Sequence, residues 1–293
     1  MNIGLIDVDG HNFPNLALMK LSSYHKKRGD NVVWYSPLIH GHVDKVYMSK
    51  VFTFTPDYDY FVDADEVVRG GTGYKEYDKV LDEEIENCFP DYSIYPSFNK
   101  AIGFLTRGCI RKCPWCIVPH KEGYIRPNAK WQDIVRQDSN LLTFMDNNIL
   151  ACDYGIEQIE ELGHTKYKID FNQGLDARLI DKSVAKALAN VKWEKYLRVA
   201  CDSSDMLPVI EQARAYLLEA GLPKTKMFAY CLIKDVEESH KRIVAVENMG
   251  INAFAQPYRD FEGGEPTKEQ KRLARWCNMK ATMKSCKFED YNK

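Results

Sequence analysis

Short apolar runs recur along the whole chain and alternate with longer amphipathic stretches. Runs of four to eight apolar residues bounded by turn residues predict buried strands, and apolar residues spaced three or four apart predict helices. Over the first part of the chain, the pattern predicts a helix starting near Pro14 and strands at 2–8, 31–35, 45–52, 60–62 and 66–74. A strand, a helix and a second strand within about 35 residues make a βαβ unit.

After residue 99 the alternation becomes regular. It predicts helices at 131–139, 154–162, 182–188, 206–220 and 236–249, and strands at 101–105, 141–145, 167–171, 196–200, 227–233 and 251–255. Six strands, each followed along the chain by a helical segment, predict an incomplete parallel barrel with helices outside. The fold class that we expect is therefore α/β.

Composition narrows the class of protein only a little. With 293 residues and 45% hydrophobic residues, the chain can bury a sizeable core, and a net charge of -2 gives no global argument for a nucleic-acid or membrane partner. No apolar run approaches the roughly 20 residues that cross a bilayer, and the N-terminus does not resemble a signal peptide. We therefore expect a cytoplasmic protein in which six scattered cysteines are free thiols: Cys88, Cys152, Cys201, Cys231, Cys277 and Cys286.

One loop concentrates the candidate chemistry. Cys109, Cys113 and Cys116 stand in the spacing C-x3-C-x2-C, directly after the strand predicted at 101–105. The C-terminal end of a parallel strand is where α/β proteins place their ligands. A four-iron cluster is normally held by four thiolates, so three leave one iron open to another ligand. Positive side chains in the same loop favour thiolates and an anionic cluster: Arg107, Arg111 and Lys112.

Two other interpretations of these cysteines stay open. Zinc also takes thiolates in tetrahedral sites, with His120 or Cys152 as the fourth ligand, although no second C-x-x-C pair follows. The cysteines can also be plain buried residues, since free cysteine is among the most buried residue types. The corresponding second function class is an iron-sulfur or zinc binding protein that uses the barrel as a scaffold and contacts nucleic acid through a basic tail.

The cysteine spacing, the strand before it and Trp115 directly before the third cysteine resemble the cluster loop of the radical S-adenosylmethionine (radical SAM) superfamily. The resemblance implies a [4Fe-4S] cluster on Cys109, Cys113 and Cys116, whose fourth iron chelates the amino and carboxylate groups of S-adenosylmethionine. It implies reductive cleavage of that cofactor to a 5′-deoxyadenosyl radical, which abstracts hydrogen from an unidentified substrate. An electron donor such as flavodoxin or ferredoxin is then expected as a partner, and Trp115 packs by the cluster and adenine.

Polar residues at the ends of the predicted strands complete the implied cofactor site. Asp146, Asn147 and Asn148 follow the second barrel strand, where relatives bind the methionine amino group, and Asp202 and Ser203 follow the fourth, where relatives approach the ribose. An arginine fork matches a carboxylate, which suits the cofactor carboxylate. Asp146 or Asp202 can alternatively cap the next helix. Arg178, after the third strand, is the arginine expected in the cofactor site. Other strand-end candidates for cofactor or substrate contact are Asn172, Gln173, Gln256, Tyr258 and Arg259.

The first part of the chain resembles the cobalamin-binding-like Rossmann domain that precedes the barrel in one radical SAM branch. The cobalt-ligating pattern Asp-x-His-x-x-Gly needs a glycine three residues after His11, where this chain has Pro14. Cobalamin is therefore doubtful, and we expect a substrate-shaping or vestigial module. The resulting organisation is a Rossmann-like domain with linker at 1–98, a partial (β/α)6 barrel at 99–262 and a C-terminal helical extension at 263–293.

Two further segments leave two interpretations each. The glycine-rich turn at 70–73 suits either a plain tight turn or a ligand loop. The tail from 267 to 293 holds eight Lys or Arg residues against three acids, which indicates either a solvated helix face or an RNA contact.

Overall fold

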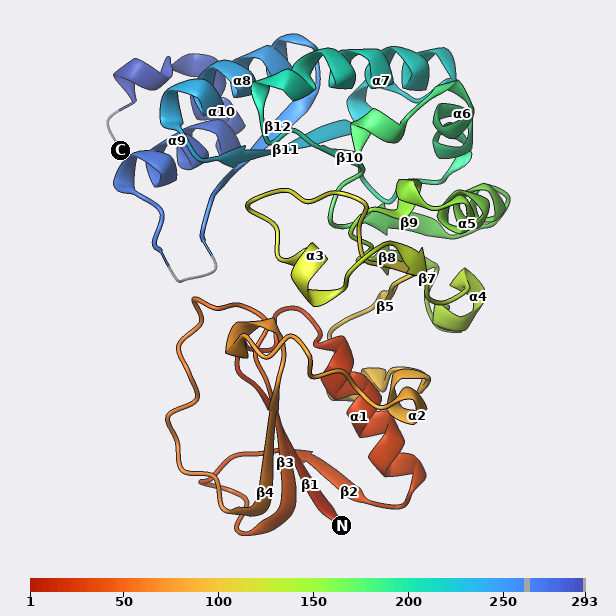
Figure 1. The fold of residues 1–293 in the computed structure, drawn as a ribbon, viewed down its shortest axis with the longest axis vertical. Helices are drawn as coiled ribbons and strands as arrows, with labels where there is room; N and C mark the ends of the chain where they lie inside the picture. Colours follow the sequence, from red (N-terminus) through yellow and green to blue (C-terminus); the bar gives the residue numbers. More distant parts are fainter. Residues whose placement is uncertain (261–263, 292–293) are drawn as a thin grey trace. The chain divides into compact units, whose positions relative to one another are not determined.

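The computed structural model describes residues 1–260 and 264–291, which belong to two compact units (Figure 1). The first unit is Met1–Asn99, and the second begins at Lys100 and takes in the described residues that follow. Both units combine helices with parallel sheets, so the α/β class is confirmed. The boundary predicted between 262 and 263 lies outside the described residues. No helix in the described ranges is long and apolar enough to cross a membrane.

The first unit is built on a parallel four-stranded sheet with the order β2-β1-β3-β4. Its helix α1 is capped by the Asn15 side chain, which accepts from Leu18 N at 3.3 Å. The strands are β1 (Asn2–Asp7), β2 (Asn31–Trp34), β3 (Val43–Ser49) and β4 (Ala64–Gly70); the helical segments are α1 (Leu16–Lys27), η1 (Thr72–Tyr74), α2 (Glu83–Glu86) and η2 (Tyr92–Ile94).

The two faces of this sheet are covered differently. On one face Ile3 and Leu5 of β1 pack against α1 and α2, whereas the other face packs against loop residues that include Tyr58 and Val62. The strand predicted at 60–62 is wrong. Val62 is drawn onto the sheet face from a loop, while Tyr60 and Phe61 are 71% and 79% exposed, so the apolar run reflects one buried side chain rather than a ladder.

The second unit contains two three-stranded parallel sheets with the orders β5-β8-β9 and β10-β11-β12. The two sheets are linked where Leu175, after β9, donates to Arg198 O at 2.7 Å and accepts from Ala200 N at 3.1 Å. All six strands predicted after residue 99 are confirmed: β5 (Ala101–Gly103), β8 (Leu141–Phe144), β9 (Lys168–Phe171), β10 (Leu197–Ala200), β11 (Met227–Ile233) and β12 (Asn252–Pro257).

Helices alternate with these strands, as predicted, and Figure 1 draws α7 and α8 along one side of β10, β11 and β12. The helix predicted at 131–139 is wrong in length, because the backbone turns extended at Val135 and Arg136 pairs with Asp138 instead of continuing the helix. The main helices are α5 (Asp153–Gly163), α6 (Lys182–Asn190), α7 (Leu207–Glu219), α8 (Val236–Asn248), α9 (Lys268–Asn278) and α10 (Lys280–Ser285). The short segments are β6 (Thr106–Arg107), α3 (Val118–Lys121), β7 (Arg126–Pro127), α4 (Trp131–Ile134), η3 (Ile149–Ala151), η4 (Ala177–Leu179), η5 (Ser204–Met206), η6 (Lys224–Lys226) and η7 (Phe288–Asp290).

The faces of the β10-β11-β12 sheet differ sharply in burial. Residues on the helix side, such as Val199, Ala229 and Ala255, are at most 1% exposed and belong to the main core. The alternate residues, such as Phe228 and Phe254, are only partly buried, and Phe254 is 39% exposed. Alternation of this kind means that one face packs on helices while the opposite face carries side chains that the core does not enclose.

Candidate functional site

The three cysteines lie on a loop that leaves β6, passes through α3 and returns along β7. The antiparallel β6–β7 pair closes the loop, and Cys109 N donates to Gly123 O at 3.1 Å. Gly108 has φ +85, and a Cβ there would come within 2.3 Å of Tyr124 O. A glycine is therefore required at this position, because both the backbone conformation and the close approach exclude a side chain.

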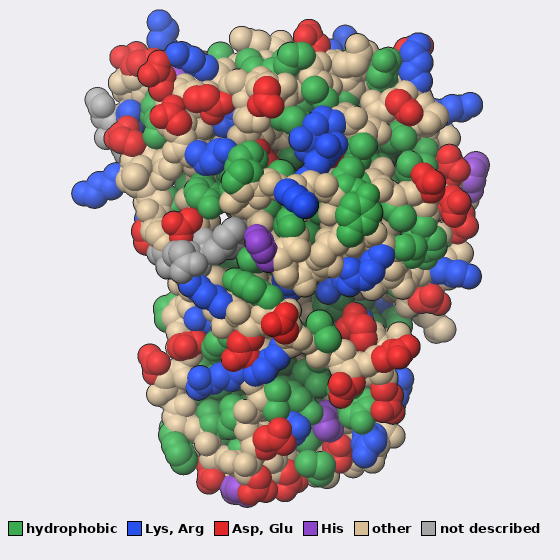
Figure 2. All heavy atoms as spheres, in the orientation of Figure 1, with side chains coloured by type: hydrophobic (Ala, Val, Ile, Leu, Met, Phe, Trp, Pro, Cys, Tyr) green, Lys and Arg blue, Asp and Glu red, His purple; other side chains and the backbone are tan. Residues whose placement is uncertain are grey.

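The loop is rich in positive charge. Between 103 and 127 it contains five Lys or Arg residues and one acid, Glu122. In Figure 2, Lys and Arg side chains lie over the area in which Figure 1 draws this loop. Such a field favours anionic sulfur and any anionic group bound by it.

Cys109 has the best developed contacts of the three thiols. Its Sγ accepts from Arg111 N at 3.3 Å and from Asn148 Nδ2 at 3.4 Å. Burial raises the pKa of Cys113, although the charge of Arg178 acts to lower it. Burial also raises the pKa of Cys116, and the other two thiols raise it further. The three sulfurs are therefore close enough to interact electrostatically.

No group of three or more His, Cys, Asp and Glu side chains in the described ranges has the geometry of a metal site as it stands. His120 is exposed on α3, and Cys152 stands at the N-terminus of α5. All nine cysteines carry free thiols; Cys88, Cys201, Cys231 and Cys277 are buried, whereas the three loop cysteines, Cys152 and Cys286 are partly exposed.

Glu122, which the sequence interpretation missed, connects several parts of the loop. Its Oε2 accepts from Gly108 N at 3.0 Å and from Asn147 Nδ2 at 2.9 Å, and its Oε1 lies 3.5 Å from Arg107 Nη1. The carboxylate thus ties the start of the cysteine loop to the segment after β8. Its status as the single acid in a basic loop was the signal available in the sequence.

Asp146 lies beneath the loop rather than open to solvent. It is 4% exposed; its Oδ1 accepts from Thr106 Oγ1 at 2.7 Å and from Thr106 N, and its Oδ2 accepts from Leu105 N at 3.1 Å. Burial raises the pKa of Asp146 to about 6, although these hydrogen bonds act to lower it. The carboxylate therefore fixes the two residues that lead into the cysteine loop.

Asn148 has one oxygen that the protein leaves without a partner. The residue is 4% exposed, its amide nitrogen donates to the Cys109 sulfur, and its Oδ1 finds no hydrogen-bond donor among the described residues. Leaving a buried carbonyl oxygen unpaired costs about 1–3 kcal/mol. A ligand with an N–H group beside Cys109 would satisfy it.

A shared carboxylate joins the loop to the segment after β9. Asp176, which the sequence interpretation also missed, accepts from Arg111 Nε at 2.8 Å and from Arg178 Nε at 2.6 Å. Burial acts to raise the pKa of Asp176, but the hydrogen bonds from Arg178 and Arg111 outweigh it, and the pKa is lowered. Arg178 therefore lies close to the cysteines, as its effect on Cys113 indicates, with its fork engaged by Asp176.

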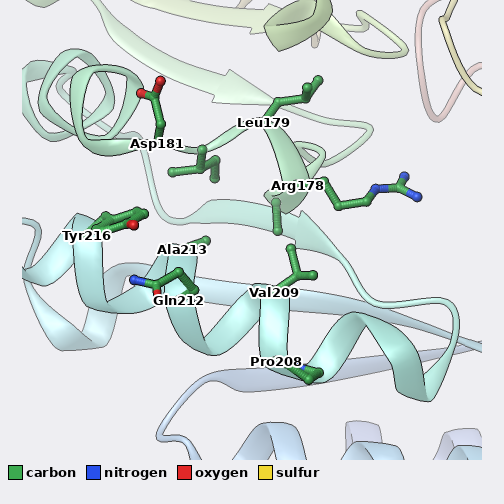
Figure 3. Close-up of a pocket in the computed structure, with 10 residues that line it drawn as sticks. Arg178, Leu179, Asp181, Pro208, Val209, Gln212, Ala213 and Tyr216 are labelled. Atoms are coloured by element: carbon green, nitrogen blue, oxygen red, sulfur yellow. The ribbon is translucent and has the colours of Figure 1, made fainter.

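Arg178 also lines a groove between η4 and α7 (Figure 3), with a volume of about 610 Å3. Apolar side chains dominate this groove, among them Leu179, Val209 and Ala213. In Figure 3 the Arg178 guanidinium points away from the other labelled side chains. The groove offers few polar groups for chemistry.

Residues at the ends of β10 and β11 meet Trp115 of the loop. Lys234 Nζ lies 3.4 Å from the centre of the Trp115 ring, a cation–π contact. Burial raises the pKa of Asp202, while the charge of Arg242 and a hydrogen bond from Trp115 act to lower it. The structure thus brings Trp115 and Asp202 together, as a shared site requires, and Ser203 follows at the start of η5.

Arg242 of α8, which the sequence did not single out, fixes the ends of these strands. It is 0% exposed, donates to Leu232 O at 2.7 Å and to Cys201 O, and pairs with Glu238 at 2.9 Å. A buried arginine inside an amphipathic helix has no distinguishing sequence signal.

The contacts that the described residues show for the remaining strand-end candidates lie outside the cysteine loop. Asn172 offers its backbone oxygen to Tyr230 Oη at 3.2 Å, and Arg259 pairs with Glu265. Gln173 and Gln256 are exposed, and Tyr258 N donates to Ile233 O at 2.9 Å.

Two motifs of the first unit have packing explanations. The His11 ring lies 4.1 Å from the Trp34 ring, centre to centre, so it packs in an aromatic turn. In the glycine-rich turn, a Cβ at Gly71 would lie 2.2 Å from Lys50 O and one at Gly73 would lie 2.4 Å from Lys50 Cγ. These glycines let the turn pack directly on Lys50.

The chain matches no protein-family model, and no curated protein is significantly similar to it.

Proposed function

We propose that the chain is a radical SAM enzyme that holds a [4Fe-4S] cluster on Cys109, Cys113 and Cys116 and binds S-adenosylmethionine beside it. The observation that carries the proposal is the combination of three neighbouring thiols on a basic loop with the unpartnered Oδ1 of Asn148 next to the first thiol. Three thiolates and one nearby acceptor for an amino group suit a cluster whose fourth iron takes an amino acid ligand.

When bound, the cluster and cofactor would supply one-electron cleavage of the sulfonium to methionine and a 5′-deoxyadenosyl radical, which takes a hydrogen atom from the substrate. An electron donor such as flavodoxin or ferredoxin would provide that electron. Asn148 would accept a hydrogen bond from the methionine amino group, with Asn147 alongside it. The residues around the bound cofactor would keep water away from the reactive carbon, which is the main task of the protein in such chemistry.

The neighbouring residues have supporting roles in this proposal. Asp146 holds Leu105 and Thr106, and so sets where the loop begins. Arg178 would offer its third nitrogen, Nη1, to the methionine carboxylate, while Asp176 holds Nε and Nη2 and so fixes its orientation. Asp202 and Ser203 would accept hydrogen bonds from the ribose, and Trp115 would cover the adenine.

The finer fold that we propose follows from strand order. Six parallel strands in the order β5-β8-β9-β10-β11-β12, with helices packed on one face, support an incomplete barrel. A parallel sheet with one helical and one loop-covered face supports a reduced Rossmann-like first unit. The packing of His11 on Trp34 gives no support for cobalt ligation, and cobalamin is not part of the proposal.

The direct test is anaerobic reconstitution with iron and sulfide, followed by electron paramagnetic resonance of the dithionite-reduced protein with and without S-adenosylmethionine. We expect about four irons per chain, a reduced-cluster signal that changes when S-adenosylmethionine is added, and formation of 5′-deoxyadenosine. Cys113→Ala should abolish the cluster, whereas Cys286→Ala, also at a partly exposed cysteine, should retain it.

The opposite outcome would identify a different class of protein. A colourless protein with one zinc per chain would replace the proposal by a structural metal site. A cluster whose signal ignores S-adenosylmethionine, with no 5′-deoxyadenosine formed, would indicate an iron-sulfur protein without radical chemistry.

A further inference from the structure

Four aromatic rings contact one another on the face of the β10-β11-β12 sheet opposite the helices. Phe228 stacks with Tyr196 at 5.6 Å and with Phe254 at 5.9 Å between ring centres. Tyr230 meets Phe228 and Phe254 edge-on at 5.3 Å and 6.0 Å. Since Phe254 is 39% exposed and the other face is fully packed, the protein leaves an aromatic surface uncovered.

A row of polar side chains continues from these rings across the neighbouring strands. Arg198 is the register partner of Phe228, and it forms an ion pair with Asp170 of β9. Asp170 is in turn the register partner of Thr143 on β8. Register partners on adjacent strands point to the same face, so all four side chains share one side of the sheet system.

This polar row is buried but incompletely satisfied. Arg198 and Asp170 are 14% and 12% exposed at their side chains, and Thr143 is 3% exposed. Thr143 Oγ1 makes no hydrogen bond within the ranges that the structure describes, whereas Arg198 Nη1 is the atom that pairs with Asp170. A buried polar atom without a partner is costly, so the Thr143 hydroxyl, next to a buried ion pair and an open aromatic surface, is best explained by a ligand that pairs with it.

We propose that this face binds the substrate, and that the substrate carries a planar nitrogen heterocycle with a ring N–H beside a carbonyl group, as in guanine. The ring would stack on the Phe254 edge of the aromatic surface. Asp170 would accept from the ring N–H, Arg198 would donate to the carbonyl, and Thr143 can do either. The alternation of acceptor and donor along the row selects this pattern over adenine, whose ring offers no N–H beside a carbonyl.

The inference rests on the proposed function, because it names the substrate class of the same enzyme, but its test is a binding measurement. The reconstituted protein with S-adenosylmethionine is titrated anaerobically with guanosine, adenosine and N-acetyltyrosine amide in a calorimeter. We expect guanosine to bind at least about tenfold more tightly than adenosine, which corresponds to one good polar pairing. Equal binding of the two nucleosides, no binding of either, or preferential binding of the tyrosine derivative would overturn the inference.

Two variants assign the binding to this face. Phe254→Leu removes a partly exposed ring and should weaken guanosine about 5–100-fold, the range for loss of one base-stacking ring. Asp170→Asn should weaken guanosine more than adenosine. Phe52→Leu, at a phenylalanine that is 50% exposed in the first unit, should bind guanosine like the wild type. Unchanged binding by Phe254→Leu would place the nucleoside elsewhere, even if Asp170→Asn fails to fold.

Measuring 5′-deoxyadenosine in the same preparations separates the two proposals. Cleavage of S-adenosylmethionine without nucleoside binding would overturn the substrate class alone. Selective guanosine binding without any cleavage would overturn the radical chemistry and leave the heterocycle site in place.

Discussion

The carboxylate beneath the cysteine loop allows a sharp test of how the loop is held. Replacing Asp146 with alanine leaves the backbone N–H groups of Leu105 and Thr106 without their acceptor, along with the Thr106 hydroxyl. At roughly 1–3 kcal/mol for each buried N–H, and less for a hydroxyl that can rotate, the loss is about 2–6 kcal/mol. Asp138→Ala is the control, since that carboxylate is exposed and a surface pair contributes about 1 kcal/mol or less.

The pH dependence makes the prediction more specific. Burial raises the pKa of Asp146 from 3.8 to about 6, so the folded protein binds a proton here that the unfolded chain has already released. This stabilising contribution is fully present below pH 3.8 and is lost as the pH rises through about 6, at a total cost of about 3 kcal/mol. The alanine variant has no carboxyl group at this position, so its stability does not fall in this way as the pH rises. Its deficit relative to wild type should therefore shrink by about 2 kcal/mol between pH 4.5 and pH 7.5.

The measurement is urea unfolding of the metal-free protein, followed by tryptophan fluorescence at both pH values. Asp146→Asn is the second variant, because it keeps an oxygen for Thr106, loses the acceptor for Leu105 and cannot titrate. Asp146→Asn should lower the free energy of unfolding less than Asp146→Ala does. Its deficit relative to wild type should shrink by the same amount between pH 4.5 and pH 7.5. A deficit that stays constant or widens as the pH rises would refute the reasoning about burial of this charge.

Three further substitutions test residues that hold the cysteine loop or the strand ends in place. Asp176→Ala should lower iron retention about 10–100-fold in a chelator competition, because outer-shell residues orient metal-binding loops; retention equal to wild type would contradict this. Arg242→Met should destabilise the second unit by about 3–5 kcal/mol in thermal or urea unfolding, since it leaves strand-end carbonyls unpaired, whereas the exposed neighbour substitution Lys241→Ala should cost about 1 kcal/mol or less. Gly108→Ala should prevent cluster assembly through a backbone clash, while Gly123→Ala, with φ +72 and open space around it, should cost only about 1–2 kcal/mol in urea unfolding; equal effects of the two would count against the clash.

The sequence predicted those parts of the fold that depend on local pattern. The apolar runs at 227–233 and 251–255 form parallel strands, because each run is buried and lies next to another strand with which it pairs. The run at 60–62 did not, because only Val62 reaches a packed surface and no neighbouring strand pairs with it. Pattern alone reports that a residue is buried, and strand pairing depends on what lies next to it.

In the candidate site, too, the sequence predicted what depends on local pattern and missed what depends on contacts between distant segments. The thiol spacing located the loop, and the strand-end rule led to Asp146, Asn148 and Asp202. The supports Asp176 and Arg242 were missed because their contacts join segments dozens of residues apart. Nor can a sequence tell that the oxygens of Asp146 are already taken by the backbone, since that depends on the path of the chain after β5.

The division of the cysteines into exposed and enclosed groups has a practical consequence for handling the protein. Four sulfurs are sealed in hydrophobic surroundings, whereas the five others, including all three of the loop, can be reached from outside. Oxygen during purification would therefore attack the loop sulfurs, together with Cys152 and Cys286, and leave the four enclosed sulfurs intact. Protein that is well folded by spectroscopy can then have oxidised loop cysteines that no longer bind a cluster. Its integrity is best judged by mass spectrometry of alkylated peptides.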